Sequence, residues 1–147
     1  ESGNDADIRT VKSLIEANGF VWALNRRTRA ANEIGSIRAL MKSWRALGSE
    51  EFSRMLVLLR CTWGGHPDSL TSFVFSGMTI FLKTYGAEMD DRLFIRQLSK
   101  VDPGEIVRRG KLDFSTNKNG LRYARVILEK YNNQRKNAKK LPYRFAD

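Results

Sequence analysis

The sequence contains only one cysteine, Cys61, and only one histidine, His66, and this scarcity limits the chemistry open to the chain. One cysteine cannot form an internal disulfide, and because Cys61 lies in an apolar run we expect a buried thiol in a reducing compartment. His66 stands between Gly65 and Pro67, where a loop histidine is expected rather than a member of a Ser-His-Asp or zinc site. A Cys61–His66 nucleophilic pair is disfavoured because the thiol is expected to face the core.

Motifs for catalysis and for cofactors are also missing from the sequence. It has no phosphate-binding loop, no dinucleotide fingerprint and no zinc-ligand spacing. The adjacent carboxylates Glu50-Glu51 and Asp90-Asp91 stand at expected helix starts, where the helix dipole favours negative charge. We therefore expect a protein that is not an enzyme, with no catalytic residue, no metal and no cofactor.

Long apolar runs are absent too. No stretch of about 18 apolar residues occurs, and no signal peptide, so we expect a cytoplasmic protein with no membrane partner. The chain opens Glu-Ser-Gly-Asn without an initiating methionine, which suggests a piece of a longer protein with residues 1–4 foreign to it or disordered. We expect one helical domain over residues 5–137, followed by a basic C-terminal tail over residues 138–147.

Apolar residues recur at helical spacing along most of the chain, which predicts a mainly α fold. We expect an irregular orthogonal bundle of about six to seven helices. The patterns cover residues 5–18, 34–47, 49–63, 68–85, 90–101, 102–110 and 121–131.

Helix boundaries follow from capping residues and glycines. Asp68, Asp90 and Asp102 are expected N-caps, and Gly48 is expected to end a helix. Gly77 interrupts the apolar stripe of residues 68–85, which suits a place where another helix passes close.

A small β element is expected near the N-terminus. Residues 20–24 are β-prone, residues 25–29 are turn-like and residues 32–34 could return as a second strand. We predict a β-hairpin near residues 20–34, packed on the helices because two strands alone are marginal.

Acidic residues are few relative to basic ones, and the surplus of basic residues is clustered along the chain. The chain has 26 Lys and Arg against 16 Asp and Glu, a net charge of +10. Residues 106–147 carry 12 basic and 3 acidic side chains, and residues 26–66 carry 8 and 3. Such clustering is typical of proteins that bind polyanions, because neutralised phosphates release counterions.

Three groups of cations are candidates for contacts with nucleic acid. They lie at the tip of the expected hairpin, in one stripe on the second helix, and in a stripe on the last helix that continues beyond it. In this order they are Arg26, Arg27 and Arg29; Arg38, Lys42 and Arg45; and Lys118, Arg122, Arg125, Arg135, Lys136, Lys139 and Lys140. Each stripe alone also fits a plain solvated helix surface, so the prediction depends on the groups together forming one continuous positive face.

Duplex DNA is the expected ligand, bound mainly through phosphates. The arginine-rich tip is the first candidate for entry into a groove, because guanidinium groups suit phosphates and guanine edges. Trp22 and Tyr123 could stack on single strands, but most aromatic residues, Phe73 among them, are expected in the core. RNA is a weaker third option.

Self-association, or binding of another protein without contact to nucleic acid, is the alternative interpretation. A large exposed apolar patch on the helix of residues 70–85 would favour it. A concentrated positive surface with interior apolar residues would favour DNA.

An ordered set of landmarks resembles a known group of proteins. The landmarks are glycines, aromatic residues and short pairs at expected turns and helix contacts: Gly19-Phe20, Ile34-Gly35, Trp63-Gly64-Gly65, Gly77, Phe81, Tyr85-Gly86, Leu93, Leu98, Tyr131-Asn132 and Leu141-Pro142. From about residue 8 to residue 142 the chain resembles the region downstream of the ParB-like N-terminal domain in ParB-related proteins of phages, plasmids and mobile elements.

The resemblance implies a DNA partner, because proteins of the ParB superfamily bind DNA in chromosome or plasmid segregation or in regulation. It also implies a missing N-terminal domain of the same protein. Some members have nuclease activity in that domain, so the resemblance argues against catalysis in this chain. The landmarks are structural positions, and none is one of the candidate cations.

Overall fold

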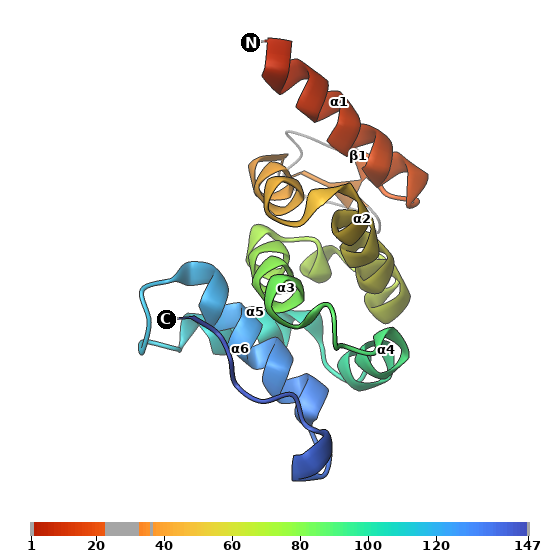
Figure 1. Cartoon of the computed structure of the whole chain (residues 1–147). Coiled ribbons are helices and arrows are strands. Elements are labelled where there is room, and N and C mark those ends of the chain that lie inside the picture. The colour runs from red at the N-terminus through yellow and green to blue at the C-terminus, as the bar shows by residue number, and fades with distance from the viewer. Residues whose placement is uncertain (1, 23–32, 36, 147) are drawn as a thin grey trace.

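The computed structural model describes residues 2–22, 33–35 and 37–146. This part of the chain is mainly helical, as the apolar spacing predicted (Figure 1). In chain order the elements are α1 (Ser2–Ala17), β1 (Val21–Trp22), β2 (Glu33–Ile34), α2 (Ile37–Trp63), η1 (Pro67–Ser69), α3 (Ser72–Tyr85), α4 (Asp91–Leu98), α5 (Pro103–Lys111), α6 (Asn119–Asn132) and η2 (Asn137–Lys139). The helix α1 begins at Ser2, earlier than the expected start at residue 5.

Helix α3 is the centre of the bundle. It lies between α2 and α6, and its most extensive contacts are with these two helices (Figure 1). Phe81 on α3 packs its ring against Tyr85, Phe94 and Tyr131 at centroid distances of 5.4, 5.9 and 6.0 Å. Gly77 faces Tyr123 of α6, which confirms the prediction that a helix passes close to this glycine.

Several helix boundaries match the capping signals. The Asp90 side chain accepts a hydrogen bond from the Leu93 amide at 3.0 Å, and Asp102 accepts one from the Gly104 amide at 3.0 Å. Gly48 has φ 82° and ψ 167°, so α2 contains a kink where the sequence predicts one helix to end and the next to begin. A positive φ costs glycine little, which explains why the break falls there.

The start of α3 differs from the prediction. Residues 67–69 form the separate turn η1, in which the His66 side chain caps the turn by accepting a hydrogen bond from the Asp68 amide at 3.0 Å. Helix α3 begins after Thr71, whose hydroxyl accepts a hydrogen bond from the Val74 amide. Threonine is an accepted N-cap but ranks below aspartate, so cap preference alone does not explain why the helix starts after Thr71 rather than at the predicted Asp68.

The prediction of a β-hairpin is wrong, because its two strands do not run antiparallel. Strands β1 and β2 pair in parallel, with Val21 opposite Glu33 and Trp22 opposite Ile34. Strands of two residues form few ladder bonds, so packing decides their orientation more than a turn does. Phe20 and Ile34 are both buried, and both pack into the core.

The prediction that Cys61 is buried is also wrong, because the residue is exposed. Cys61 lies one helical turn after Val57, whose exposure is 46 %. Both residues are on the outer face of α2, whereas Leu58, Leu59 and Thr62 are buried. An apolar run longer than the buried face must place some of its members outside.

Part of the expected C-terminal tail packs back on the bundle. The hydroxyl of Tyr85 donates to the Pro142 carbonyl at 2.6 Å and accepts from the Arg144 amide at 2.8 Å. The side chain of Asn132 pairs with both backbone groups of Leu141, and Phe145 is 6 % exposed. Residues 141–146 are therefore held against the helices.

Candidate nucleic-acid interface

The first group of candidate cations cannot be placed. Arg26, Arg27 and Arg29 lie outside the described residues.

The second group lies on the first half of α2. Arg38 and Lys42 are exposed and have no ion-pair partner among the residues that the structure describes. Arg45 is less available for contact with a phosphate, because its guanidinium lies 3.6 Å from the Asp7 carboxylate of α1. These cations border a shallow groove between α1 and α2 with Ile8 and other apolar side chains on its floor.

The third group, on α6, mainly holds the loop that precedes this helix. Arg125 donates to Asp113 Oδ2 at 3.0 Å, to Ser115 Oγ at 2.5 Å and to the Tyr143 hydroxyl at 2.8 Å. Arg122 donates twice to the Thr116 carbonyl, at 3.2 and 3.0 Å. Because Arg125 is only 23 % exposed and fully engaged, it is a structural residue rather than a free phosphate ligand.

Electrostatics reinforce this loop network. Hydrogen bonds from Ser115, followed by those from Arg125, lower the pKa of Asp113 below its ordinary value despite some burial. The hydrogen bond to the Tyr143 hydroxyl, with the contribution of Asp113, raises the pKa of Arg125. Lys118 donates from Nζ to the Ala146 carbonyl at 3.2 Å, which ties the loop to the C-terminal segment.

Four candidate cations follow α6 within residues 135–140, and no ion pair joins them to a carboxylate in the described parts of the chain. Lys136, Lys139 and Lys140 are exposed, and none has an ion-pair partner within the described parts of the chain. Arg135 donates to the Lys139 carbonyl at 3.4 Å, which folds this segment into a short loop with its lysines outward.

Two further basic residues that the sequence did not single out, Arg96 and Lys100, lie on α4 and just after it. Lys100 contacts the Gln97 side chain at 3.3 Å, and Gln97 in turn donates to the carbonyls of Tyr131 and Asn133 at the end of α6. Arg96 is exposed on α4, four residues before Lys100, which follows the end of that helix. The name terminal basic cluster is used here for Arg96, Lys100, Arg135, Lys136, Lys139 and Lys140.

The signal for the two missed cations was the spacing of Arg96 and Lys100, four residues apart. It was overlooked because residues 67–105 carry a net charge of −2. In the structure, nearby acids are engaged elsewhere: Asp91 pairs with Arg54 at 2.7 Å, and Glu105 pairs with Lys130 at 2.9 Å. A segment with a negative net charge can therefore still contribute a positive surface to the folded protein.

The candidate cations do not form one continuous face in the described residues. The first half of α2 lies beside α1 at one end of the molecule, and residues 137–139 lie at the opposite end (Figure 1). Between them, Arg122 and Arg125 are used internally. The expected single positive face is thus replaced by two separate groups.

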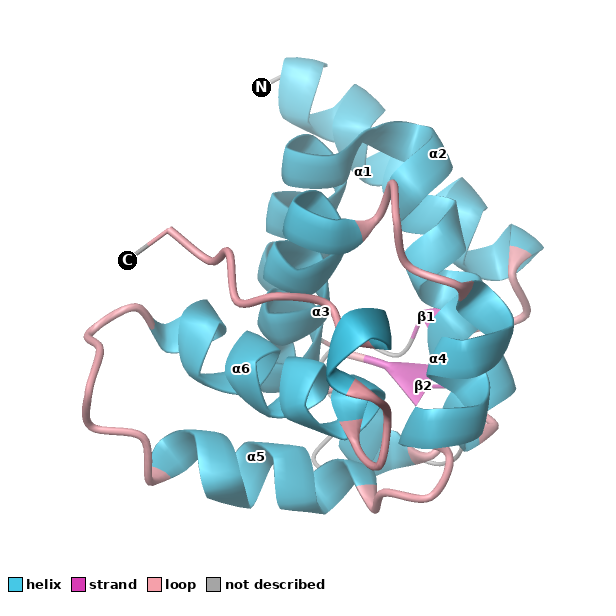
Figure 2. Ribbon diagram, turned by 60° about the horizontal axis from the view of Figure 1, so that its bottom comes forward, coloured by secondary structure: helices cyan, strands magenta, loops and turns pink. Residues whose placement is uncertain are grey.

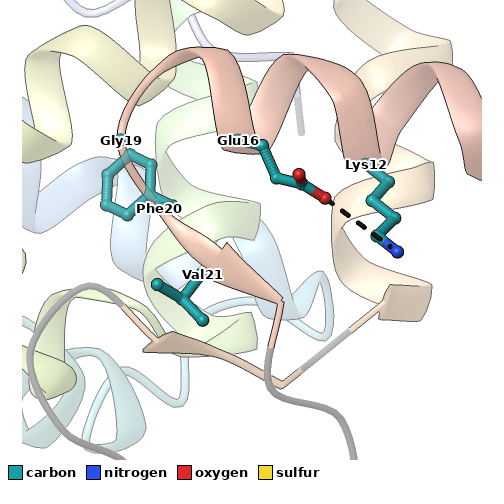
Figure 3. A pocket seen from close by; sticks show the side chains of 5 residues that line it. All are labelled: Lys12, Glu16, Gly19, Phe20 and Val21. Carbon is teal, nitrogen blue, oxygen red and sulfur yellow. Dashed lines mark ion pairs between the residues drawn. The ribbon is translucent and has the colours of Figure 1, made fainter.

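A hollow lies beside α1 and β1 (Figure 3). It has a volume of about 520 Å³ and is lined by Phe20 and Val21, among others. Its charged residues, Lys12 and Glu16, pair with one another at 4.0 Å and are both about half exposed.

The described residues contain neither a candidate metal site nor a candidate membrane-spanning helix. No group of three or more His, Cys, Asp or Glu side chains among them could hold a metal ion. None of the helices in the described part is both long and apolar enough to cross a membrane.

Comparisons with known proteins place the chain in a family. No curated protein and no solved structure matches it. Residues 2–145 match a family described as "Family of unknown function (DUF6551)". Since this match covers almost the whole chain, the protein belongs to the DUF6551 family.

Proposed function

We propose that this domain binds duplex DNA, chiefly through contacts between the terminal basic cluster and phosphates. The observation that carries the proposal is a set of six cations in residues 96–100 and 135–140, none of which has a carboxylate partner among the described residues. Gln97 joins the first segment to Asn133, just before the second. Cations that pair internally cannot release counterions from DNA, whereas these remain available.

The composition of the cluster favours a duplex over a single strand. It consists of four lysines and two arginines, and no aromatic side chain takes part. Lysine provides a point charge on a flexible stem, which suits phosphates of any sequence. A duplex has the denser phosphate charge, so it gains most from such a surface.

Two further observations support a DNA partner. Arg38 and Lys42 provide a second exposed cationic group on α2, which a long duplex could reach separately. The resemblance to ParB-related proteins of mobile elements points to the same ligand, and this relationship is itself part of the proposal.

The salt dependence of binding tests the proposal. We expect the logarithm of the affinity for a random-sequence duplex to fall linearly with the logarithm of the salt concentration between about 50 and 200 mM, with a slope near −5 if all six cations contact phosphates. Fluorescence anisotropy of a labelled duplex measures this slope. A slope close to zero, or no binding at low salt, would overturn the proposal.

A matched pair of variants locates the contact. Lys136→Gln with Lys139→Gln removes two charges from the terminal basic cluster, and we expect the slope to become shallower by about 2. Arg9→Gln with Lys83→Gln removes the same charge from exposed positions on α1 and α3. Equal losses in both variants would show that only net charge matters and that the cluster is not the binding site.

Self-association is the second candidate function, and exposed apolar residues favour it. Leu112 and Phe114, after α5, are 71 % and 80 % exposed, and Phe73 on α3 is 37 % exposed rather than buried as expected. Sedimentation velocity at several protein concentrations, without nucleic acid, would reveal a dimer that this patch stabilises.

A further inference from the structure

Phe114 is the most exposed large apolar side chain among the described residues, and its position is held rather than loose. It lies in the loop between α5 and α6, which stands at the edge of the molecule (Figure 2). The Asp113 carboxylate accepts hydrogen bonds from the Ser115 amide at 3.1 Å and from the Ser115 hydroxyl at 2.6 Å. Arg125 binds both of these residues from α6. A fixed backbone on both sides of Phe114 presents its ring to solvent.

The surroundings of Phe114 carry positive charge. Residues 111–125 contain four cations and one acid; Arg122 and Arg125 bind groups of this loop, and the acid is paired with Arg125. Lys111 and Lys118 are exposed on either side of the loop. Lys111 also lies 4.8 Å above the ring of Phe73, so its ammonium group is kept near the surface of α3.

A second exposed aromatic ring belongs to the same network. Tyr143 is 51 % exposed, and its hydroxyl accepts the hydrogen bond from Arg125. Arg125 thus connects the loop that carries Phe114 with the segment that carries Tyr143. Tyr123, which the sequence suggested for stacking, is buried at 3 % exposure and cannot serve.

We propose that Phe114, with Tyr143 beside the same arginine, is a stacking site for unpaired bases of single-stranded nucleic acid. Exposed aromatic rings among cations are the arrangement that such ligands require, because the rings stack on bases while the cations attract the backbone. The inference rests on the proposed function, since it takes nucleic acid as the ligand, and it adds a site for single strands away from the terminal basic cluster.

Charge decides between this ligand and a second copy of the chain. Two copies meeting at this loop would bring Lys111 and Lys118 of each copy toward those of the other, and such like-charge contacts oppose association. A polyanion with aromatic bases complements both the charge and the rings. The test must therefore distinguish binding of nucleic acid from binding of a protein at this loop.

Two oligomers of equal charge test the stacking directly. One is a thymidine oligomer of about 12 nucleotides, and the other is an abasic deoxyribose-phosphate chain of the same length. We expect the protein to bind the thymidine oligomer about tenfold more tightly, because only that oligomer can stack. Equal affinity for the two would overturn the inference.

Variants of Phe114 identify the ring responsible. Phe114→Leu should lose most of the preference for thymidine and keep its affinity for the abasic chain, whereas Phe114→Trp should keep the preference. The added indole of Phe114→Trp should be quenched by the thymidine oligomer and not by the abasic one, relative to the unmodified protein. Unchanged thymidine binding by Phe114→Leu would overturn the inference, and so would loss of self-association as the only effect of that variant.

The two proposals can fail separately. Lys136→Gln with Lys139→Gln should weaken duplex binding and leave the preference for thymidine over the abasic chain unchanged. A Phe114-dependent preference that persists without any duplex binding would support the stacking site and contradict the duplex proposal. Duplex binding without any preference for thymidine would do the reverse.

Discussion

Gly77 of α3 and Tyr123 of α6 meet so closely that a side chain on the glycine would have no room. A Cβ at position 77 would stand 2.7 Å from the Tyr123 Cβ and 3.1 Å from the Tyr123 carbonyl carbon. The contact is with backbone as well as with side chain, so it could be relieved only by moving the two helices apart. The most extensive helix pair in the domain therefore depends on one missing methyl group.

Gly77→Ala should lower the stability of the domain. The overpacked contact costs about 1–3 kcal/mol, and the better helix propensity of alanine returns about 1 kcal/mol of this. We expect a net loss of about 1 kcal/mol in the free energy of unfolding, measured by urea denaturation. Lys83→Ala on the exposed face of the same helix is the control, with an expected change within about 0.5 kcal/mol. A more stable Gly77→Ala variant would contradict the close approach.

Tyr85→Phe should loosen the C-terminal segment. The change leaves the Pro142 carbonyl and the Arg144 amide without the partner that now binds both. An unsatisfied partly buried group costs about 1–3 kcal/mol, so we expect a loss of that order in stability. Amide hydrogen exchange should accelerate at residues 141–146 more than in α3. Uniform acceleration throughout the domain would argue that the tyrosine stabilises only the core.

Arg54→Lys should destabilise the domain almost as much as Arg54→Ala. Arg54 of α2 donates to the Gly86 carbonyl at 2.6 Å and to the Met89 carbonyl at 3.1 Å, and it pairs with Glu51 and Asp91. Lysine keeps the charge but cannot bind four acceptors in a planar fork. Hydrogen bonds of charged groups contribute about 1.5–3 kcal/mol, which sets the expected loss in thermal or urea unfolding. Full stability of Arg54→Lys would show that charge alone matters here.

The loop network should make stability depend on pH in the acid range. Hydrogen bonds from Ser115 and Arg125 lower the pKa of Asp113, so the folded state holds this proton less tightly than the unfolded chain does. The contribution of Asp113 is therefore complete above its ordinary pKa of about 4 and is lost as the pH falls through the lower pKa of the folded state. Urea titrations at several pH values should show a smaller loss between neutral and acid pH for Asp113→Asn. An identical pH profile in the variant would contradict this assignment.

Much of the secondary structure was predictable because its signals are local. A helix start at Asp90 or Asp102 depends on an amide two or three residues away, and the kink at Gly48 depends on the conformation of a single residue. The competing caps Asp68 and Thr71 show the limit of such reasoning. Each is a valid local signal, and only the packing of the surrounding chain chose between them.

The candidate interface was less predictable because the availability of a charge depends on distant residues. Arg125 is an attractive phosphate ligand by its position on α6, yet Asp113 and Tyr143 use its donors. Lys100 lies in a segment of net negative charge, yet it is brought beside the end of α6 through Gln97. The number of cations can be read from the sequence, but which of them are neutralised by a partner in the folded protein cannot.

The order of residues along the chain was sufficient for a basic, mainly helical domain, because helix periodicity, caps and net charge involve neighbours or simple sums. Which helices meet, which strand direction is used and which aromatic rings and cations stay exposed were decided by the folded chain. These features arise from contacts between residues tens of positions apart, such as Arg54 with Asp91 and Tyr85 with Arg144. Such contacts form only when the whole core packs, and they leave Phe114 and the terminal basic cluster facing solvent.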